Sequence, residues 1–148
     1  MDTHTGTSTD KRTREEIYQT DLLPFRAGIG AGAEAVLVSH NVVSSIDAQN
    51  PASLSPKIHE ILRQDLGFSG VIITDDIAMG ALADLPNTAA RAVAAGNDLI
   101  ITTDYKQSMA EIKQALAEGE LSEAQLDQAA AKVVAWKYAK GLLVDAER

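Results

Sequence analysis

The chain has no cysteine and few aromatic residues. Cysteine is absent from all 148 residues, which excludes disulfide bonds, a thiolate nucleophile and cysteine-bound zinc. Phe, Trp and Tyr make up 4% of the sequence, which disfavours a binding surface built from aromatic rings. Hydrophobic residues nevertheless reach 45%, an ordinary share for a globular protein that buries an aliphatic core.

Positive charge is scarce, and long apolar runs are missing. The formal net charge is -8, whereas nucleic-acid-binding proteins usually present a basic face, so we expect no nucleic-acid partner. No apolar run approaches the roughly 20 residues of a membrane span. The first residues show no basic region followed by an apolar core, so we expect neither a signal peptide nor a membrane partner. The compartment stays open, and both a cytoplasmic and an exported protein fit the composition.

Helix-forming and strand-forming segments alternate along the chain. The hydrophobic periodicity and the end signals predict helices over residues 13–30, 55–66, 79–95, 106–118 and 122–141. Thr13 opens the first helix with a capping box, and breaks are expected near Pro24 and Pro86. Strands, each short and hydrophobic on both faces, are predicted over residues 33–39, 71–74 and 97–102. Residues 1–12 are expected to form a mobile loop before the β/α units of a single domain, 1–148.

This order of elements predicts an α/β fold. Strands that are apolar on both faces and joined by helices are typical of a parallel sheet covered on both sides. Three strands are few, and a complete (β/α)8 barrel needs about 250 residues. The chain is therefore either a compact open α/β domain or about three β/α units of a barrel with an extra C-terminal helix.

Polar side chains stand where two of the predicted strands end. Asp75 and Asp76 follow the strand at 71–74, and His40 follows the strand at 33–39. The carboxyl ends of parallel strands are where such folds keep their chemistry. Successive strand residues point to opposite faces, so at most one of the two aspartates reaches a site cleanly. The alternative is structural: the aspartates start a helix, and the histidine bonds to backbone.

Other polar residues carry weaker signals. Asp2 and His4 lie in the polar first segment, where the carboxylate could fix the imidazole tautomer for proton transfer, although a solvated terminus is the simpler interpretation. Asp47, in the loop after His40, is a further candidate for the same rim. His59 is expected to be structural or solvent-facing, and Trp136 and Tyr138 are expected to pack.

Several segments together resemble family 3 glycoside hydrolases, and most closely their bacterial β-N-acetylglucosaminidase branch. Gly67 to Met79, which reads GFSGVIITDDIAM, resembles the family's nucleophile segment. The other similar segments are residues 21–26 (DLLPFR), 35–40 (AVLVSH), 51–55 (PASLS), 95–100 (AGNDLI) and 137–143 (KYAKGLL). The resemblance covers nearly the whole chain and implies the C-terminal part of a (β/α)8 catalytic barrel.

The resemblance implies a role for each candidate. Asp75 would be the nucleophile of a retaining reaction that hydrolyses terminal β-linked N-acetylglucosamine. His4 would be the general acid/base, oriented by Asp2, because Asp2-Thr3-His4 resembles the family's Asp-Ser-His motif. His40 and Met79 would line the sugar subsite. No metal or organic cofactor is implied.

The sequence also departs from the family pattern. The Lys-His-Phe-Pro-Gly-His-Gly segment expected before Asp2, which holds sugar hydroxyls, and the first five barrel strands are not in this sequence. We therefore expect weak or no activity from the chain alone, and an exposed strand edge that favours self-association or binding of an N-terminal half-barrel. The alternative function is a non-catalytic half-barrel that serves structure or oligomerisation. A glucosidase of the same family is disfavoured, because Asp76 stands where that branch usually carries Trp.

Overall fold

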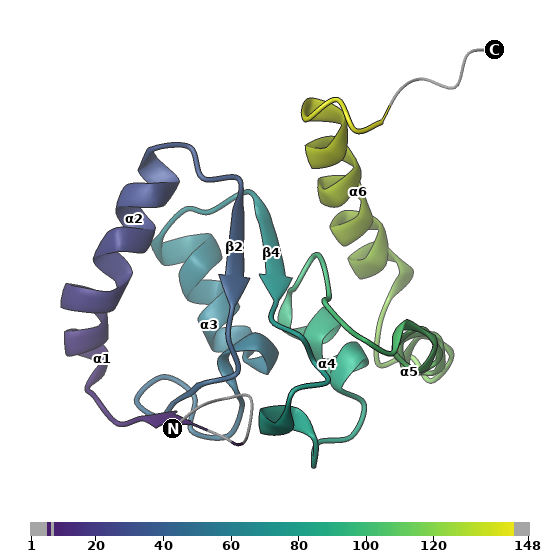
Figure 1. Cartoon of the computed structure of the whole chain (residues 1–148), viewed down its shortest axis with the longest axis horizontal. Coiled ribbons are helices and arrows are strands. Elements are labelled where there is room, and N and C mark those ends of the chain that lie inside the picture. Colours follow the sequence, from purple (N-terminus) through teal and green to yellow (C-terminus); the bar gives the residue numbers. More distant parts are fainter. Residues whose placement is uncertain (1–5, 7, 144–148) are drawn as a thin grey trace.

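Two parallel strands lie at the centre of the molecule. The computed structural model describes residues 6 and 8–143, and in it β2 (Ala35–Val38) lies beside β4 (Val71–Thr74) with Ala35 opposite Val71 and Val38 opposite Thr74. Figure 1 shows the two strands side by side, both pointing the same way, with α3 behind them. This mixed α/β arrangement of parallel strands and helices fits a partial barrel.

Helices connect and flank the strands in the predicted order. Three helical elements follow one another before β2: α1 (Arg14–Glu16), the π-helical segment η1 (Ile17–Asp21) and α2 (Leu22–Gly30). Between β2 and β4 lie η2 (Ala52–Leu54), α3 (Pro56–Glu60) and η3 (Ile61–Asp65). After β4 come η4 (Gly80–Leu82), α4 (Thr88–Ala95), α5 (Tyr105–Ala117) and α6 (Glu123–Ala139). None of the helices within the described residues is both long and apolar enough to cross a membrane.

The first helical stretch follows its sequence signals. The Thr13 side chain accepts a hydrogen bond from the Glu16 N–H, and the Glu16 side chain accepts one from the Thr13 N–H, which completes the predicted capping box. The predicted break near Pro24 takes the form of the π-helical turn just upstream. Proline has no N–H to donate to the preceding turn, so the hydrogen-bond register changes there at little cost.

The predicted strand at 97–102 is not regular. A single bridge joins Leu99 to Ile73, although the segment runs beside β4 as expected. Two side chains take the place of backbone ladder bonds: the Ile72 N–H donates to Asp98 Oδ2 at 2.8 Å, and the Ile101 N–H donates to Thr74 Oγ1 at 3.0 Å. The segment therefore lies where the strand was predicted but does not form a regular strand. The reason is that these two side chains accept N–H groups that a regular ladder would use.

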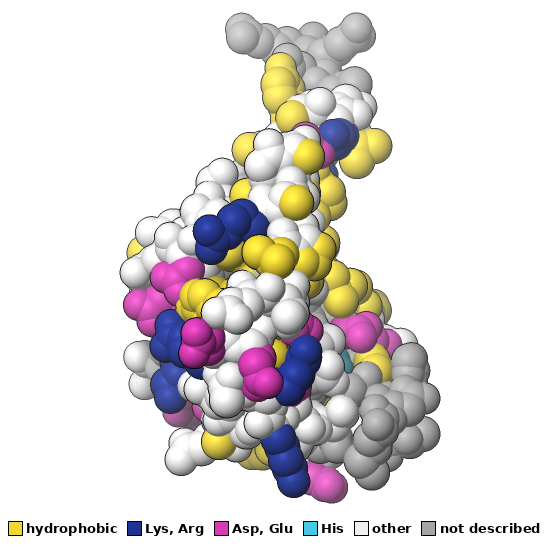
Figure 2. Space-filling view, turned by 90° about the vertical axis from the view of Figure 1, so that its left-hand side faces the viewer, with side chains coloured by type: hydrophobic (Ala, Val, Ile, Leu, Met, Phe, Trp, Pro, Cys, Tyr) yellow, Lys and Arg dark blue, Asp and Glu magenta, His cyan; other side chains and the backbone are white. Residues whose placement is uncertain are grey.

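A short second ladder lies in the segment that we predicted as a loop. β1 (Thr9–Asp10) pairs in parallel with β3 (Val42–Val43), which follows β2. The Arg12 guanidinium then bonds both Asp10 and Asp21, and so joins β1 to η1. Figure 2 shows acidic and basic side chains interspersed on this side of the molecule. Ser8, Thr9, Asp10 and Arg12 therefore have defined partners, and the mobile loop expected for 1–12 stays a prediction.

One buried cluster lies on one face of the strands. Val36, Val38 and Ile72 pack with Leu62 and Phe68 in a buried cluster between the strands and α3 with η3. The opposite face is partly open within the described part of the chain: Leu37 is 52% exposed although Val71 is buried, and no helix crosses the near side of the strands in Figure 1. This open face corresponds to the inside of a barrel that these strands do not close by themselves.

Candidate active site

Asp75 and Asp76 lie in the turn directly after β4. The Asp75 N–H donates to the Val38 carbonyl at 3.0 Å, which extends the pairing of β4 with β2 to the end of both strands. The Asp76 N–H donates to Asp75 Oδ1 at 2.8 Å, so one oxygen of the Asp75 carboxylate has a fixed partner. Asp76 Oδ1 instead accepts the Ala78 N–H at 2.9 Å. Each aspartate thus has one oxygen engaged by a backbone N–H of the turn, and the expectation that at most one of them reaches a site stays a prediction.

His40 lies beneath this turn and is completely buried, with 0% of its surface exposed. Its Nε2 lies 2.9 Å from the Asp76 carbonyl oxygen, and its Nδ1 lies 2.7 Å from Ser53 Oγ. A carbonyl oxygen can only accept, so Nε2 donates. Both ring nitrogens bond to protein, and the direct sugar contact that we expected of His40 has no support in this geometry.

Asp47 organises the loop between β3 and η2 from inside. Burial raises the pKa of its carboxyl, but hydrogen bonds from the Asn50 side chain, the Ser55 hydroxyl and two backbone N–H groups outweigh burial and lower the pKa. Asn50 in turn accepts a hydrogen bond from Arg91 on α4 at 3.1 Å. Asp47 therefore has a structural role here, and does not line the rim beside Asp75 as we had considered.

Of the remaining candidates, Met79 lies beside the turn after β4, and His59 lies in α3. Met79 is half-buried four positions after Asp75, and its N–H donates to the Asp76 carbonyl at 3.0 Å. His59 is buried and its Nδ1 bonds the Ser55 carbonyl at 2.8 Å, in agreement with a structural role. Asp2 and His4 lie outside the described residues.

Two residues support the site without having been singled out. Ser53 is completely buried and is the Nδ1 partner of His40. Asn97 Nδ2 donates to the Ser53 carbonyl at 2.7 Å and to the Ala92 carbonyl at 2.8 Å. Ser53 belongs to the segment 51–55 whose resemblance to the family was noted, and that was its only signal. Asn97 likewise belongs to the noted segment 95–100, but its contacts could not be deduced from local pattern, because its partners are 44 and five residues away along the chain.

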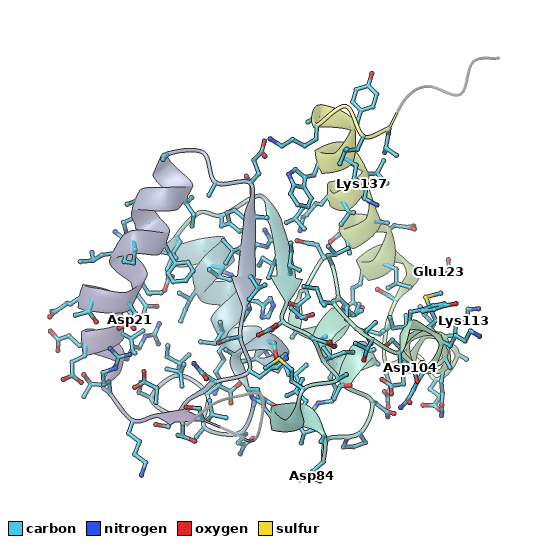
Figure 3. All side chains as sticks on the ribbon, in the orientation of Figure 1. Asp21, Asp84, Asp104, Lys113, Glu123 and Lys137 are labelled. Atoms are coloured by element: carbon cyan, nitrogen blue, oxygen red, sulfur yellow. The ribbon has the colours of Figure 1, made fainter. Side chains whose placement is uncertain are left out.

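Asp75 is half-buried and lines none of the larger cavities found among the described residues. A cavity of about 280 Å³ lies elsewhere, between α2 and β2, and Asp75 is not among its lining residues. Within the described part of the chain, no group of three or more His, Asp or Glu side chains is arranged to hold a metal ion. The charged side chains labelled in Figure 3, such as Asp21, Asp84 and Lys113, lie at the periphery of the molecule.

Comparison with known proteins identifies the family. Residues 1–136 match the family model described as the glycosyl hydrolase family 3 N-terminal domain. The chain belongs to glycoside hydrolase family 3. A β-hexosaminidase of Stenotrophomonas maltophilia (strain K279a) is 44% identical over 104 residues, which are 68% of this chain and 31% of that relative. A β-hexosaminidase of Xanthomonas campestris pv. campestris (strain B100) is 38% identical over 128 residues, 84% of this chain and 38% of that relative.

The fold agrees with a solved structure from the same family. The glycoside hydrolase family 3 β-N-acetylglucosaminidase from Paenibacillus sp. str. FPU-7 has a TM-score of 0.90 and 28% identity, over 100% of this chain and 30% of that one. The family 3 chain described here therefore spans about a third of the length of these relatives.

Proposed function

We propose that this chain carries the nucleophile of a retaining β-N-acetylglucosaminidase, with Asp75 in that role. The observation that carries the proposal is the position of Asp75: it ends a parallel strand, one of its oxygens is oriented by the Asp76 N–H at 2.8 Å, and its neighbour Asp76 has a separate bond to Ala78. The relatives described above, a β-hexosaminidase and a β-N-acetylglucosaminidase, support this substrate class.

The reaction would proceed by two displacements at the anomeric carbon. In the first, an Asp75 oxygen forms a bond to that carbon while the bond to the leaving oxygen breaks, and His4 gives the leaving oxygen a proton. In the second, water loses a proton to His4 and displaces Asp75, which regenerates the carboxylate. Two inversions retain the configuration of the sugar. Asp2 orients the His4 imidazole.

The ladder between β1 and β3 supports the role of His4. The Val42 N–H donates to the Ser8 carbonyl at 2.8 Å. Val42 lies four positions after Val38, and the Val38 carbonyl accepts the Asp75 N–H. Four residues of extended chain span up to about 14 Å. His4 precedes Ser8 by four residues, so this length of chain is compatible with the role proposed for His4.

Met79 is the described residue that we propose for the sugar subsite. It follows Asp75 by four positions and is half-buried, so its flexible thioether can pack on the apolar face of a sugar ring. His40 remains part of the site in this proposal, but from beneath the turn. The substrate would be a glycan with a terminal β-linked N-acetylglucosamine.

We further propose that the open edge of β2 is completed by an N-terminal half-barrel of parallel β/α units. Within the described residues β2 pairs only with β4. Two cavities of about 280 and 270 Å³ lie along its other edge, and both are lined by Phe25, Val36 and Leu37. An added parallel strand would bond the free backbone groups and fill both apolar cavities. The relatives are about three times as long as the part that matches.

A chimera tests the catalytic proposal. Residues 1–136 would replace the matching segment of the Stenotrophomonas β-hexosaminidase, and hydrolysis of a chromogenic N-acetyl-β-glucosaminide would be measured. We expect turnover that falls about 10³-fold or more in Asp75→Asn, because an amide cannot form the glycosyl ester. Asp76→Asn is the matched control and should retain far more activity. A folded, active chimera that tolerates Asp75→Asn would refute the proposal.

The alternative is a half-barrel without catalysis that serves structure or oligomerisation. The exposed Leu37 and the edge of β2 that is unpaired within the described residues favour this alternative, because they could form a docking surface without taking part in catalysis. In that case the chimera would fold without turnover, and Asp75→Asn would make no difference.

A further inference from the structure

Three separate segments meet at the His40 side chain. His40 follows β2, Ser53 belongs to η2, and Asp76 belongs to the turn after β4. The imidazole bonds Ser53 Oγ at 2.7 Å and the Asp76 carbonyl at 2.9 Å. His40 and Ser53 are both 0% exposed. A buried ring with both nitrogens bonded is a rigid link, because neither bond can be replaced by one to bulk water.

The direction of these bonds follows from their partners. The Asp76 carbonyl only accepts, so Nε2 carries a hydrogen. In a neutral ring Nδ1 then accepts from the Ser53 hydroxyl. The same Asp76 carbonyl also accepts the Met79 N–H at 3.0 Å. Two donors therefore hold this carbonyl from two sides, one from the scaffold below and one from the turn itself.

This link continues to the Asp75 carboxylate. Asp76 is held at its carbonyl by His40, and its N–H donates to Asp75 Oδ1 at 2.8 Å. We propose that His40 is a positioning residue, which fixes the Asp75 carboxylate through Asp76 and does not contact the sugar. The functional meaning of this inference rests on the proposed role of Asp75 as the nucleophile.

Hydrogen exchange of backbone amides in the 148-residue chain tests the inference. The Asp75 and Ile77 N–H groups flank Asp76 and donate to the Val38 and Ile101 carbonyls. In His40→Leu we expect both amides to exchange about tenfold faster or more relative to the Val71 amide at the other end of β4, because the turn opens locally without its anchor. In the parent chain, NMR should show a slowly exchanging hydrogen on His40 Nε2.

His59 supplies the matched control, because it is a second buried histidine with a backbone partner. His59→Leu should destabilise the fold without selectively exposing the Asp75 and Ile77 amides. His40→Gln keeps a donor near the Nε2 position and should restore protection to within about threefold of the parent. If His40→Leu does not fold, His40→Asn replaces it, since its shorter side chain keeps a polar group towards Ser53 but cannot reach Asp76.

Three results would overturn the inference. They are equal acceleration at Val71 and at the two turn amides, the same pattern in His59→Leu, and no restoration by His40→Gln. The experiment needs no substrate and no turnover. Loss of the proposed function in the chimera would therefore leave this result standing, and failure of the exchange pattern would leave the nucleophile assignment standing.

Discussion

At the scale of single residues, the surroundings of two carboxylates separate their roles. Both oxygens of Asp47 are bonded: Oδ1 accepts the Gln49 N–H, and Oδ2 accepts the Asn50 side chain and the Ser55 hydroxyl. Asp75 is half-buried at a strand end, and one of its oxygens bonds the N–H of the next residue. A carboxylate whose oxygens are all engaged is poorly available to attack carbon. The comparison therefore favours Asp75 for chemistry and Asp47 for loop structure.

Asp47 predicts a specific dependence of stability on pH. Its pKa in the folded chain is lowered because four hydrogen bonds outweigh burial. A group whose pKa is lower when folded stabilises the fold above its unfolded pKa, about 3.9, and that stability is lost as pH falls through the folded value. We expect Asp47→Asn to cost about 2 kcal/mol at pH 7 and much less at pH 2. Urea unfolding of both proteins at the two pH values measures this, and an equal cost at both would contradict it.

Gly70 predicts a steric effect at the start of β4. A Cβ built there would lie 2.3 Å from the Glu34 carbonyl oxygen and 2.7 Å from the Phe68 ring. We expect Gly70→Ala to lower the free energy of unfolding by about 2–3 kcal/mol, because backbone must move to admit the methyl group. Gly28, within α2, has nothing within 4 Å of a built Cβ. Gly28→Ala should therefore be neutral or slightly stabilising in the same denaturation series, and an equal loss in both variants would exclude the steric explanation.

The sequence could predict which residues matter at the site better than how they act. Asp75 and His40 stand out because polar groups end hydrophobic strands. The partners of His40 are 13 and 36 residues away along the chain, so its inward orientation could not be deduced from local pattern. The roles of His4 and Asp2 remain predictions.

At the scale of elements, local signals set most boundaries and tertiary contacts set the exceptions. Ser122 forms the capping box that starts α6, and Gly67, Gly96 and Gly119 adopt positive φ at element ends. The segment 97–102 departs from a regular strand because Asp98 and Thr74 accept N–H groups that a ladder would use. Such competition depends on side chains that folding brings together, so the hydrophobic periodicity of the sequence cannot predict it.

Asp98 joins η3 and α6 to the segment beside β4, and its substitution should lower the free energy of unfolding. Its side chain is 4% exposed and bonds Arg63 of η3 at 2.5 Å and Lys132 of α6 at 2.9 Å. We expect Asp98→Asn to cost about 3 kcal/mol, because it leaves two cations without their shared partner. Glu34→Gln removes the exposed pair with Lys140 and should change the unfolding free energy little. Chemical denaturation compares them, and similar losses in both would contradict this account.

At the scale of the whole molecule, the open face of the strands dominates. Leu37 and Ile101 are 52% and 41% exposed, and β2 lacks a second neighbour within the described residues. The α/β class could be predicted because the strands are apolar on both faces and alternate with helices, whereas the choice of a partial barrel over an open domain came from the resemblance to family 3. What covers the open face could not, since that depends on chain beyond these strands.

The open face predicts association when no half-barrel is supplied. We expect the 148-residue chain to form oligomers in size-exclusion chromatography with light scattering, since exposed strand edges pair with other chains. Leu37→Lys should shift the distribution towards monomer, because a charge on the edge opposes pairing. Leu23→Lys, at an exposed position on α2, is the control. A monodisperse monomer in the parent chain would contradict this prediction.

The central claim is that Asp75 is the nucleophile, and covalent trapping tests it most directly. The active chimera would be treated with a fluorinated N-acetylglucosaminide that leaves a slowly hydrolysed glycosyl ester, and the labelled peptide would be mapped by mass spectrometry. The account predicts one sugar on Asp75, no label in Asp75→Asn and unchanged labelling in Asp76→Asn. A label on another carboxylate, or undiminished labelling of Asp75→Asn, would contradict it.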